Sequence, residues 1–161
     1  MKDFKEIILY PYKIKSLLMK DSTIAKLILN DADANVLDEA TESQLRQSIF
    51  DYSFVEEIVQ DTKSFICVDV EFPWQATDTI TSAQLVVLIG VSRSIMTLDN
   101  SKFKGMPGNR LANLFVATNS VITNSGIGIG TQHLQTGKSY VVSRDFACKQ
   151  LVYDIPNVSC S

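Results

Sequence analysis

One apolar stretch in the middle of the chain, AQLVVLIGVS at residues 83–92, constrains the fold more than any other. From Leu85 to Val91 every residue has an apolar side chain except Gly90, which has none, so neither face of an extended segment would be polar. A strand with two apolar faces is covered on both sides. We therefore expect a central strand of a sheet, covered by helices or by a neighbouring subunit.

The segment before it alternates with a period of two. Between residues 65 and 72 one face carries Phe65, Cys67, Asp69 and Glu71, and the other carries only apolar side chains. This pattern predicts a strand with one buried face, joined to the next strand by a polar connection. Two more strands are expected at 139–143 and 147–155, with Pro156 ending the pairing.

Helices are predicted both before and after the strand pair in the sequence. Residues 109–123 have one apolar stripe at three- and four-residue spacing, which is typical of an amphipathic helix. The first third of the chain predicts a helix starting near Pro11, a second one capped by Asp21 or Ser22, a loop at 30–39 and a short helical or extended piece at 44–52. Together these patterns predict a single α+β domain, residues 1–161. Its mainly antiparallel sheet of about four to five strands packs against the amphipathic helix, and its N-terminal helical part covers about residues 1–50.

The glycine-rich stretch at 124–137, NSGIGIGTQHLQTG, raises the question of phosphate binding. A dinucleotide loop needs a strand before its glycines and a helix after them. Here the glycines follow a helix and precede a strand, which is the wrong polarity. We expect Gly126 to be the left-handed residue that ends the helix, and Gly128 and Gly130 to leave one strand face bare.

Charge and cysteine content exclude several classes of function. The 15 basic and 18 acidic residues give a net charge of −3 without long runs, which argues against nonspecific nucleic-acid binding. No apolar run is long enough to span a bilayer and no signal-peptide pattern is present, so we expect a soluble protein made in the cytoplasm, with no membrane partner. Three widely separated cysteines do not form a disulfide or zinc pattern, and Cys67 and Cys148 are expected to be buried.

Candidate catalytic residues are few. His133 is the only histidine, so a nucleophilic dyad with Cys148 or a serine would have to use it, but no matching motif accompanies it. Asp69 and Glu71 lie about 7 Å apart on one strand face, yet nothing else in the sequence supplies the further ligands of a cation site. The acidic run at 31–42 resembles a calcium loop only in part, because Val36 occupies the position of the required glycine. We expect no catalytic residue, cofactor or metal.

Two connections carry large apolar side chains instead of purely polar ones. The segment 72–83 and the segment 95–107 are both long for simple turns. Such side chains are enriched at protein interfaces. The candidate interface residues are Pro73, Trp74, Ile80, Met96, Phe103 and Met106. Trp74 could alternatively fold back onto its own core.

The order of these parts resembles the tail terminator and tail-completion proteins of tailed bacteriophages. The resemblance lies in the N-terminal helices (KIKSLLMKDSTIAKLIL), the strand pair (SFICVDVEF and AQLVVLIGV), the arginine-led helix with its glycine-containing exit (GNRLANLFVATNSVITNSGIGIGTQHL) and the final strand (DFACKQLVYDI). It implies a non-enzymatic virion protein, made in the host cytoplasm, that forms a ring, commonly sixfold, at the head–tail junction.

The same resemblance implies the partners. They are other copies of the chain, the tail tube protein and the neck or connector proteins, while genomic DNA passes through without sequence-specific binding. Asp69 and Glu71 would then face the lumen. Two alternatives stay open, a cellular adaptor module without fixed symmetry and a small enzyme that uses His133 with Cys148 or a carboxylate.

Overall fold

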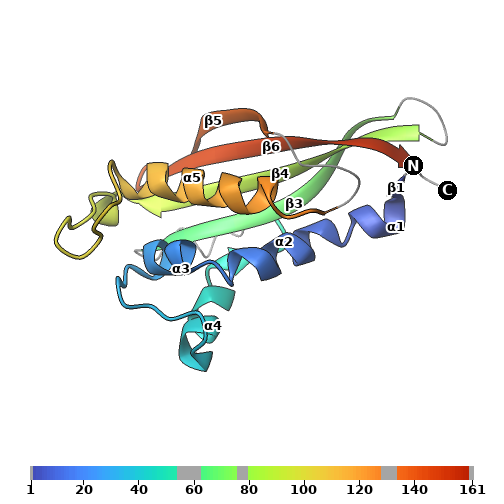
Figure 1. Cartoon of the computed structure of the whole chain (residues 1–161). Helices are drawn as coiled ribbons and strands as arrows, with labels where there is room; N and C mark the ends of the chain where they lie inside the picture. The colour runs from blue at the N-terminus through green and yellow to red at the C-terminus, as the bar shows by residue number, and fades with distance from the viewer. Residues whose placement is uncertain (1, 54–62, 76–79, 128–133, 160–161) are drawn as a thin grey trace.

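The computed structural model describes residues 2–53, 63–75, 80–127 and 134–159. The chain folds into a single sheet with helices on one face (Figure 1). The helices are α1 (Phe4–Ile7), α2 (Tyr10–Leu18), α3 (Ser22–Leu29), α4 (Glu39–Arg46) and α5 (Arg110–Thr123), with a short 3-10 helix η2 (Arg93–Ile95). The strands are β1 (Lys2–Asp3), β2 (Ile49–Phe50), β3 (Ser64–Gln75), β4 (Ile80–Ser92), β5 (Leu134–Ser143) and β6 (Phe146–Ser159).

The sheet has six strands in the order β1-β6-β4-β3-β2, with β5 also paired to β6. All pairings among the four long strands are antiparallel, and the two-residue strands β1 and β2 add parallel pairs at the margins. Strand β4 lies between β3 and β6, as its two apolar faces predict. The predicted α+β fold with a mainly antiparallel sheet is confirmed.

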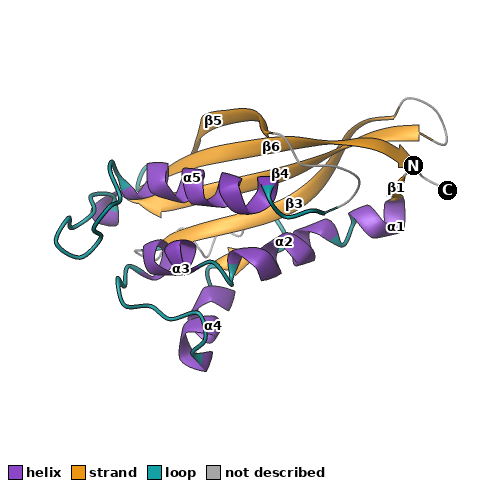
Figure 2. Cartoon of the chain, in the orientation of Figure 1, coloured by secondary structure: helices purple, strands orange, loops and turns teal. Residues whose placement is uncertain are grey.

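The main core lies between this sheet and the layer of α2, α3 and α5 (Figure 2). From the sheet, Ile66 and Val68 of β3 and Leu85, Val87 and Ile89 of β4 enter it. Helix α5 contributes its predicted stripe, in which the fully or nearly fully buried members are Leu111, Leu114, Thr118 and Ile122. Helix and sheet thus bury apolar surface at the periods their sequences predict.

A second, smaller cluster lies on the opposite face of the sheet. It consists of Phe65, Cys67, Phe146 and Cys148, with Phe50 and Leu88 packed against it. Gly90 of β4 makes this packing possible, since a Cβ atom there would come within 2.3 Å of the Phe65 ring. The prediction that Cys67 and Cys148 are buried is confirmed.

Two prolines lie inside strands, which corrects two sequence expectations. Strand β6 continues past Pro156 to Ser159, and β3 includes Pro73 and Trp74, so the connection at 72–83 is largely strand. Each proline lies where the register shifts, between Glu71 and Trp74 in one pair of strands and opposite residues 81–83 in the other. A β-bulge leaves a residue out of the hydrogen-bond ladder, so a proline without an N–H is tolerated there.

The helix ends follow the predicted signals with one exception. The Asp21 side chain accepts a hydrogen bond from the Ile24 amide at 2.9 Å, and Gly126 has a φ of 64° just after α5. The exception is α4, which begins at Glu39 and ends at Arg46, earlier than the piece expected at 44–52. Two acidic residues in its first turn, Glu39 and Glu42, favour a helix N-terminus there.

Candidate interaction surfaces

The segment 95–107, one of the two with candidate interface residues, is held in place by a buried arginine at the start of α5. Arg110 donates from Nε to the Ile95 carbonyl at 2.8 Å, from Nη1 to the Leu27 carbonyl at 2.6 Å and from Nη2 to the Asn30 side chain. Leu27 belongs to the last turn of α3, where carbonyls lack partners within the helix. Burial lowers the pKa of Arg110 from its ordinary value, but a guanidinium remains protonated at neutral pH.

Three of the candidate interface residues lie in the segment between η2 and α5. Phe103 is 5% exposed and belongs to the main core, with the Arg110 guanidinium 5.2 Å from the centre of its ring. Met96 and Met106 are partly buried against the same core. The protein's own core therefore accounts for the apolar character of this loop, and Phe103 is not an exposed anchor.

The other three candidate interface residues lie at the far end of the β3–β4 hairpin. Pro73 and Trp74 are in β3 and Ile80 is in β4, and Trp74 pairs with Ser82. The side chains of these three residues are outside what the structure describes. Their backbone positions place them away from the loop that holds Phe103, because β4 runs its full length between the two sites.

The open face of the sheet carries an acidic row. Glu71 of β3, Gln84 of β4 and Asp154 of β6 are direct cross-strand partners, so their side chains share one face, and Asp69 lies two residues along β3. Gln84 donates to Asp154 at 3.0 Å, and Ser53 donates to Asp69. The structure thus brings the two predicted acidic residues together with Asp154. The alternation within 147–155 is the sequence signal that could have placed Asp154 beside them.

The residues considered for catalysis do not form a described site. His133 lies outside the described residues, as do Gly128 and Gly130 of the glycine-rich stretch, while Cys148 lies in the smaller cluster. Burial, and then the nearby Cys148 and Asp69, raise the pKa of Cys67 to about 12. A thiol with such a pKa is protonated at neutral pH and is a poor nucleophile.

The residues that partly resemble a calcium loop are used locally. The Asp31 carboxylate accepts a hydrogen bond from the Asp33 amide at 2.9 Å, and the Asn35 side chain accepts one from the Leu37 amide at 3.1 Å. Glu42 forms an ion pair with Arg46 within α4. Within the described parts of the chain, no group of three acidic, cysteine or histidine side chains is arranged to hold a metal ion.

A groove lies between α2, the loop before α4 and α4 itself, with a volume of about 810 Å³. We call it the α2–α4 groove. Its lining residues are Tyr12, Lys15, Ser16, Met19, Lys20, Val36, Leu37, Glu42 and Arg46. The sequence does not reveal this groove, because its lining residues come from three segments that share no common motif.

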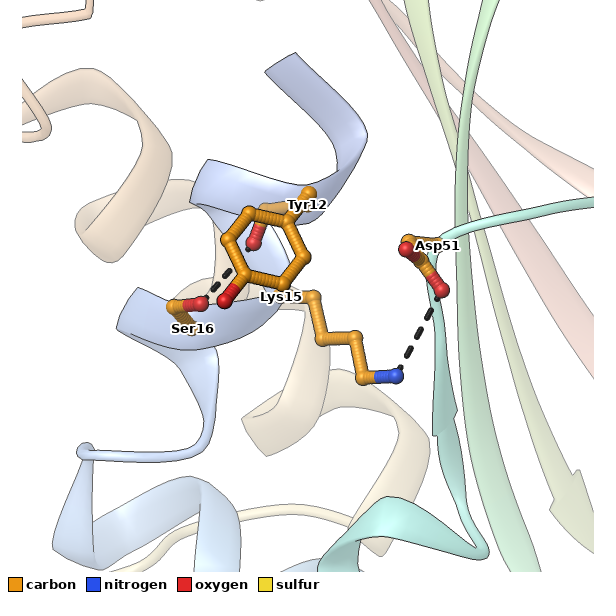
Figure 3. A network of polar contacts seen from close by, with 4 residues as sticks. All are labelled: Tyr12, Lys15, Ser16 and Asp51. Carbon is orange, nitrogen blue, oxygen red and sulfur yellow. Dashed lines mark hydrogen bonds and ion pairs between the residues drawn. The ribbon is translucent and has the colours of Figure 1, made fainter. Parts of the chain in front are cut away.

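Lys15 fixes α2 to the end of the sheet beside this groove. Its Nζ atom lies 3.4 Å from Oδ1 of Asp51, which follows β2, and the side chain reaches from α2 toward that strand (Figure 3). On another side of the helix, the Ser16 hydroxyl donates to the Tyr12 carbonyl at 3.0 Å (Figure 3). The residue Tyr12 is 62% exposed. The groove therefore keeps an available aromatic side chain while its backbone is held in place.

In a comparison with known proteins, residues 21–155 match the family model described as YomW. The chain belongs to the YomW family. YomW is a phage-derived family, so the protein is phage-associated. The match to YomW includes α3, α4, α5 and all four long strands except the end of β6. No curated protein and no solved structure matches the chain. None of the described helices has both the length and the apolar character needed to cross a bilayer.

Proposed function

We propose that the protein is a non-enzymatic structural component of a phage virion that forms a ring at the head–tail junction. In this role it would cap the tail tube, contact the neck or connector proteins, and let genomic DNA pass without sequence-specific binding. Its derivation from phages supports a virion role, and the order of its helices and strands resembles that of tail terminator proteins.

The observation that carries the proposal is the acidic row on the open sheet face. Asp69 and Glu71 of β3 and Asp154 of β6 project from the two strands that flank β4, on the side away from the helix layer. A DNA duplex carries a dense negative charge along its axis. A channel wall with the same sign of charge would repel the phosphates, which allows DNA to slide without sticking. This face is therefore the best candidate for the lumen.

The test is the assembly state of the purified chain. Negative-stain imaging and native mass spectrometry should show closed rings, commonly sixfold. Trp74→Ala should reduce ring formation with unchanged circular dichroism if the far end of the β3–β4 hairpin reaches a neighbour. A chain that stays monomeric at every concentration would contradict the proposal.

A second candidate is an interaction module without fixed symmetry, and the exposed α2–α4 groove favours it. Such a module would show a concentration-dependent equilibrium between monomer and dimer in place of closed rings. The assembly measurement separates the two candidates directly.

A further inference from the structure

The α2–α4 groove combines a concave shape with exposed apolar side chains. Leu37 is 87% exposed and Tyr12 is 62% exposed, while Met19 and Val36, which also line the groove, are partly buried against the main core. A pocket for a small molecule encloses most of its ligand. Here two of the lining side chains lie largely in solvent, so the groove is better suited to a segment of another macromolecule.

Exposed apolar side chains are concentrated in the N-terminal part of the chain, and two of them, Tyr12 and Leu37, line this groove. Of the seven large hydrophobic residues that are exposed in the described parts of the chain, five lie between residues 4 and 37. Two others, Ile8 and Leu9, lie between α1 and α2, just before the helix that carries Tyr12. Single exposed apolar side chains are ordinary, whereas a contiguous patch indicates an interaction site.

The charges that line the groove are mainly positive. Lys15, Lys20 and Arg46 face one lining carboxylate, Glu42, in a chain whose net charge is −3. Lys15 pairs with Asp51 and Arg46 pairs with Glu42. Lys20 has no ion-pair partner among the described residues, so its charge is available to a ligand. With both ion pairs counted, Lys20 leaves one unpaired positive charge among the described residues that line the groove, opposite in sign to the net charge of the whole chain.

We propose that the α2–α4 groove binds an acidic segment of a partner protein. Apolar side chains of that segment would pack against Tyr12 and Leu37, and its carboxylates would face Lys20 and Arg46. Apolar contacts surrounded by charges of complementary sign are the usual composition of a protein interface. Tyrosine and arginine are also the side chains most often found at its energetic centre. This binding does not depend on ring formation.

The test uses a library of short random peptides displayed against the full-length chain. Peptides are selected on the wild type and counter-selected on Lys20→Glu combined with Leu37→Ser. Both substitutions are at exposed or rim positions, so the thermal midpoint of the variant should match that of the wild type. The retained peptides should be rich in Asp or Glu together with Leu, Phe or Trp. Retained peptides without net negative charge, or no retained peptides, would overturn the proposal.

A labelled peptide from the selection then gives the affinity by fluorescence anisotropy. Lys20→Glu should weaken binding at least about tenfold, because it replaces attraction by repulsion. Added salt should weaken binding to the wild type in the same direction. The controls Lys104→Glu and Val116→Ser change an exposed charge and an exposed apolar side chain elsewhere, and should leave affinity unchanged. Equal losses in the controls would overturn the proposal.

The same variants separate a partner segment from a second copy of the chain. Size-exclusion chromatography with light scattering should give the same mass for the wild type and for Lys20→Glu with Leu37→Ser. A wild type that self-associates and a variant that dissociates would show that a second copy fills the groove, which overturns the proposal. Rings that persist in the variant leave the proposed function intact.

Discussion

Arg110 joins three parts of the chain that are far apart in sequence. Its guanidinium bonds to a carbonyl 15 residues before it and to another 83 residues before it, and its backbone amide donates to the Met96 carbonyl at 2.9 Å. A buried charge without hydrogen bonds would be strongly destabilising, so these acceptors are what permit its burial. Arg110 holds α3, the segment after β4 and α5 in one arrangement.

Replacing Arg110 should therefore cost much more stability than replacing an exposed arginine. Arg110→Met leaves the Leu27 and Ile95 carbonyls without their donor, and we expect a loss of about 3–5 kcal/mol in the free energy of unfolding. Arg93→Met, at an exposed position of η2, should cost within about 0.5 kcal/mol. Urea unfolding of both variants measures the difference. Equal losses would mean that the hydrogen bonds of Arg110 contribute little.

The sequence could not have shown this role. Arginine is usually exposed, and the acceptors here are two backbone carbonyls and an amide side chain, which leave no pattern in a single sequence. Asp69 and Glu71 were easier to place, because strand alternation alone puts them on one face. The groove residues had no such signal, since exposed positions of a helix and a loop are not constrained by packing.

Among the elements, α5 follows its sequence pattern most closely. Its stripe was predicted from three- and four-residue spacing, and Leu114 and Ile122 are fully buried. Phe115 lies at the edge of the stripe, where its ring packs against Gly137 of β5 and Lys149 lies over it at 5.0 Å. Which face of α5 is buried is therefore the feature that the sequence spacing predicts most directly among the helices and strands.

Truncating Leu114 should be costly while truncating the opposite face should not. Leu114→Ala should lower the free energy of unfolding by about 2–5 kcal/mol, because a fully buried side chain leaves a cavity. Val116→Ala, at a position 66% exposed, should change it by less than about 0.5 kcal/mol. Thermal or urea unfolding gives both values. Similar losses at the two positions would show that the helix is rotated from its assigned phase.

Asn113 is a poor control for this experiment. Its side-chain amide donates to the carbonyls of Pro107 and Asn109, both at 2.8 Å, so its removal disturbs the start of the helix. Asn113 is polar and is not part of the apolar stripe of α5. Its local hydrogen bonds depend on the turn before α5, whose geometry no periodic pattern encodes.

The sequence also does not reveal the short parallel strands or the two bulges. Strands β1 and β2 have two residues each, too few for alternation to be recognised. Pro73 and Pro156 indicated strand ends, because a proline interrupts a regular ladder. Both strands instead continue past a register shift, on the two sides of the same part of β4. A bulge depends on the partner strand, so one segment's sequence does not specify it.

At the scale of the whole molecule, substitution of Phe103 tests whether its side chain stabilises the single chain or contacts a neighbouring subunit. Phe103→Ala should lower the free energy of unfolding by about 3–5 kcal/mol, because the ring belongs to the main core. That is a large share of the stability of an ordinary domain. Leu37→Ala, at an exposed position, should stay within about 0.5 kcal/mol.

Urea unfolding at several protein concentrations is the measurement that tests this prediction. A midpoint for Phe103→Ala that falls equally at all concentrations is the expected result for a core side chain. If stability is kept and only self-association is lost, Phe103 contacts a neighbouring subunit instead. Because Phe103 lies in the core, its substitution does not isolate assembly from stability, and Trp74→Ala is the appropriate variant for the assembly test.

Strand β6, the last of the six strands in the sequence, completes the pairing of the sheet. Strand β6 pairs with β4, β5 and β1, and its residues 158–159 lie beside residues 2–3 (Figure 1). During synthesis β6 is therefore the last of these strands to leave the ribosome, and until then one edge of the apolar strand β4 has no partner. An unpaired apolar edge is prone to pair with other chains. The nascent chain consequently has to keep that edge protected until its final strand emerges.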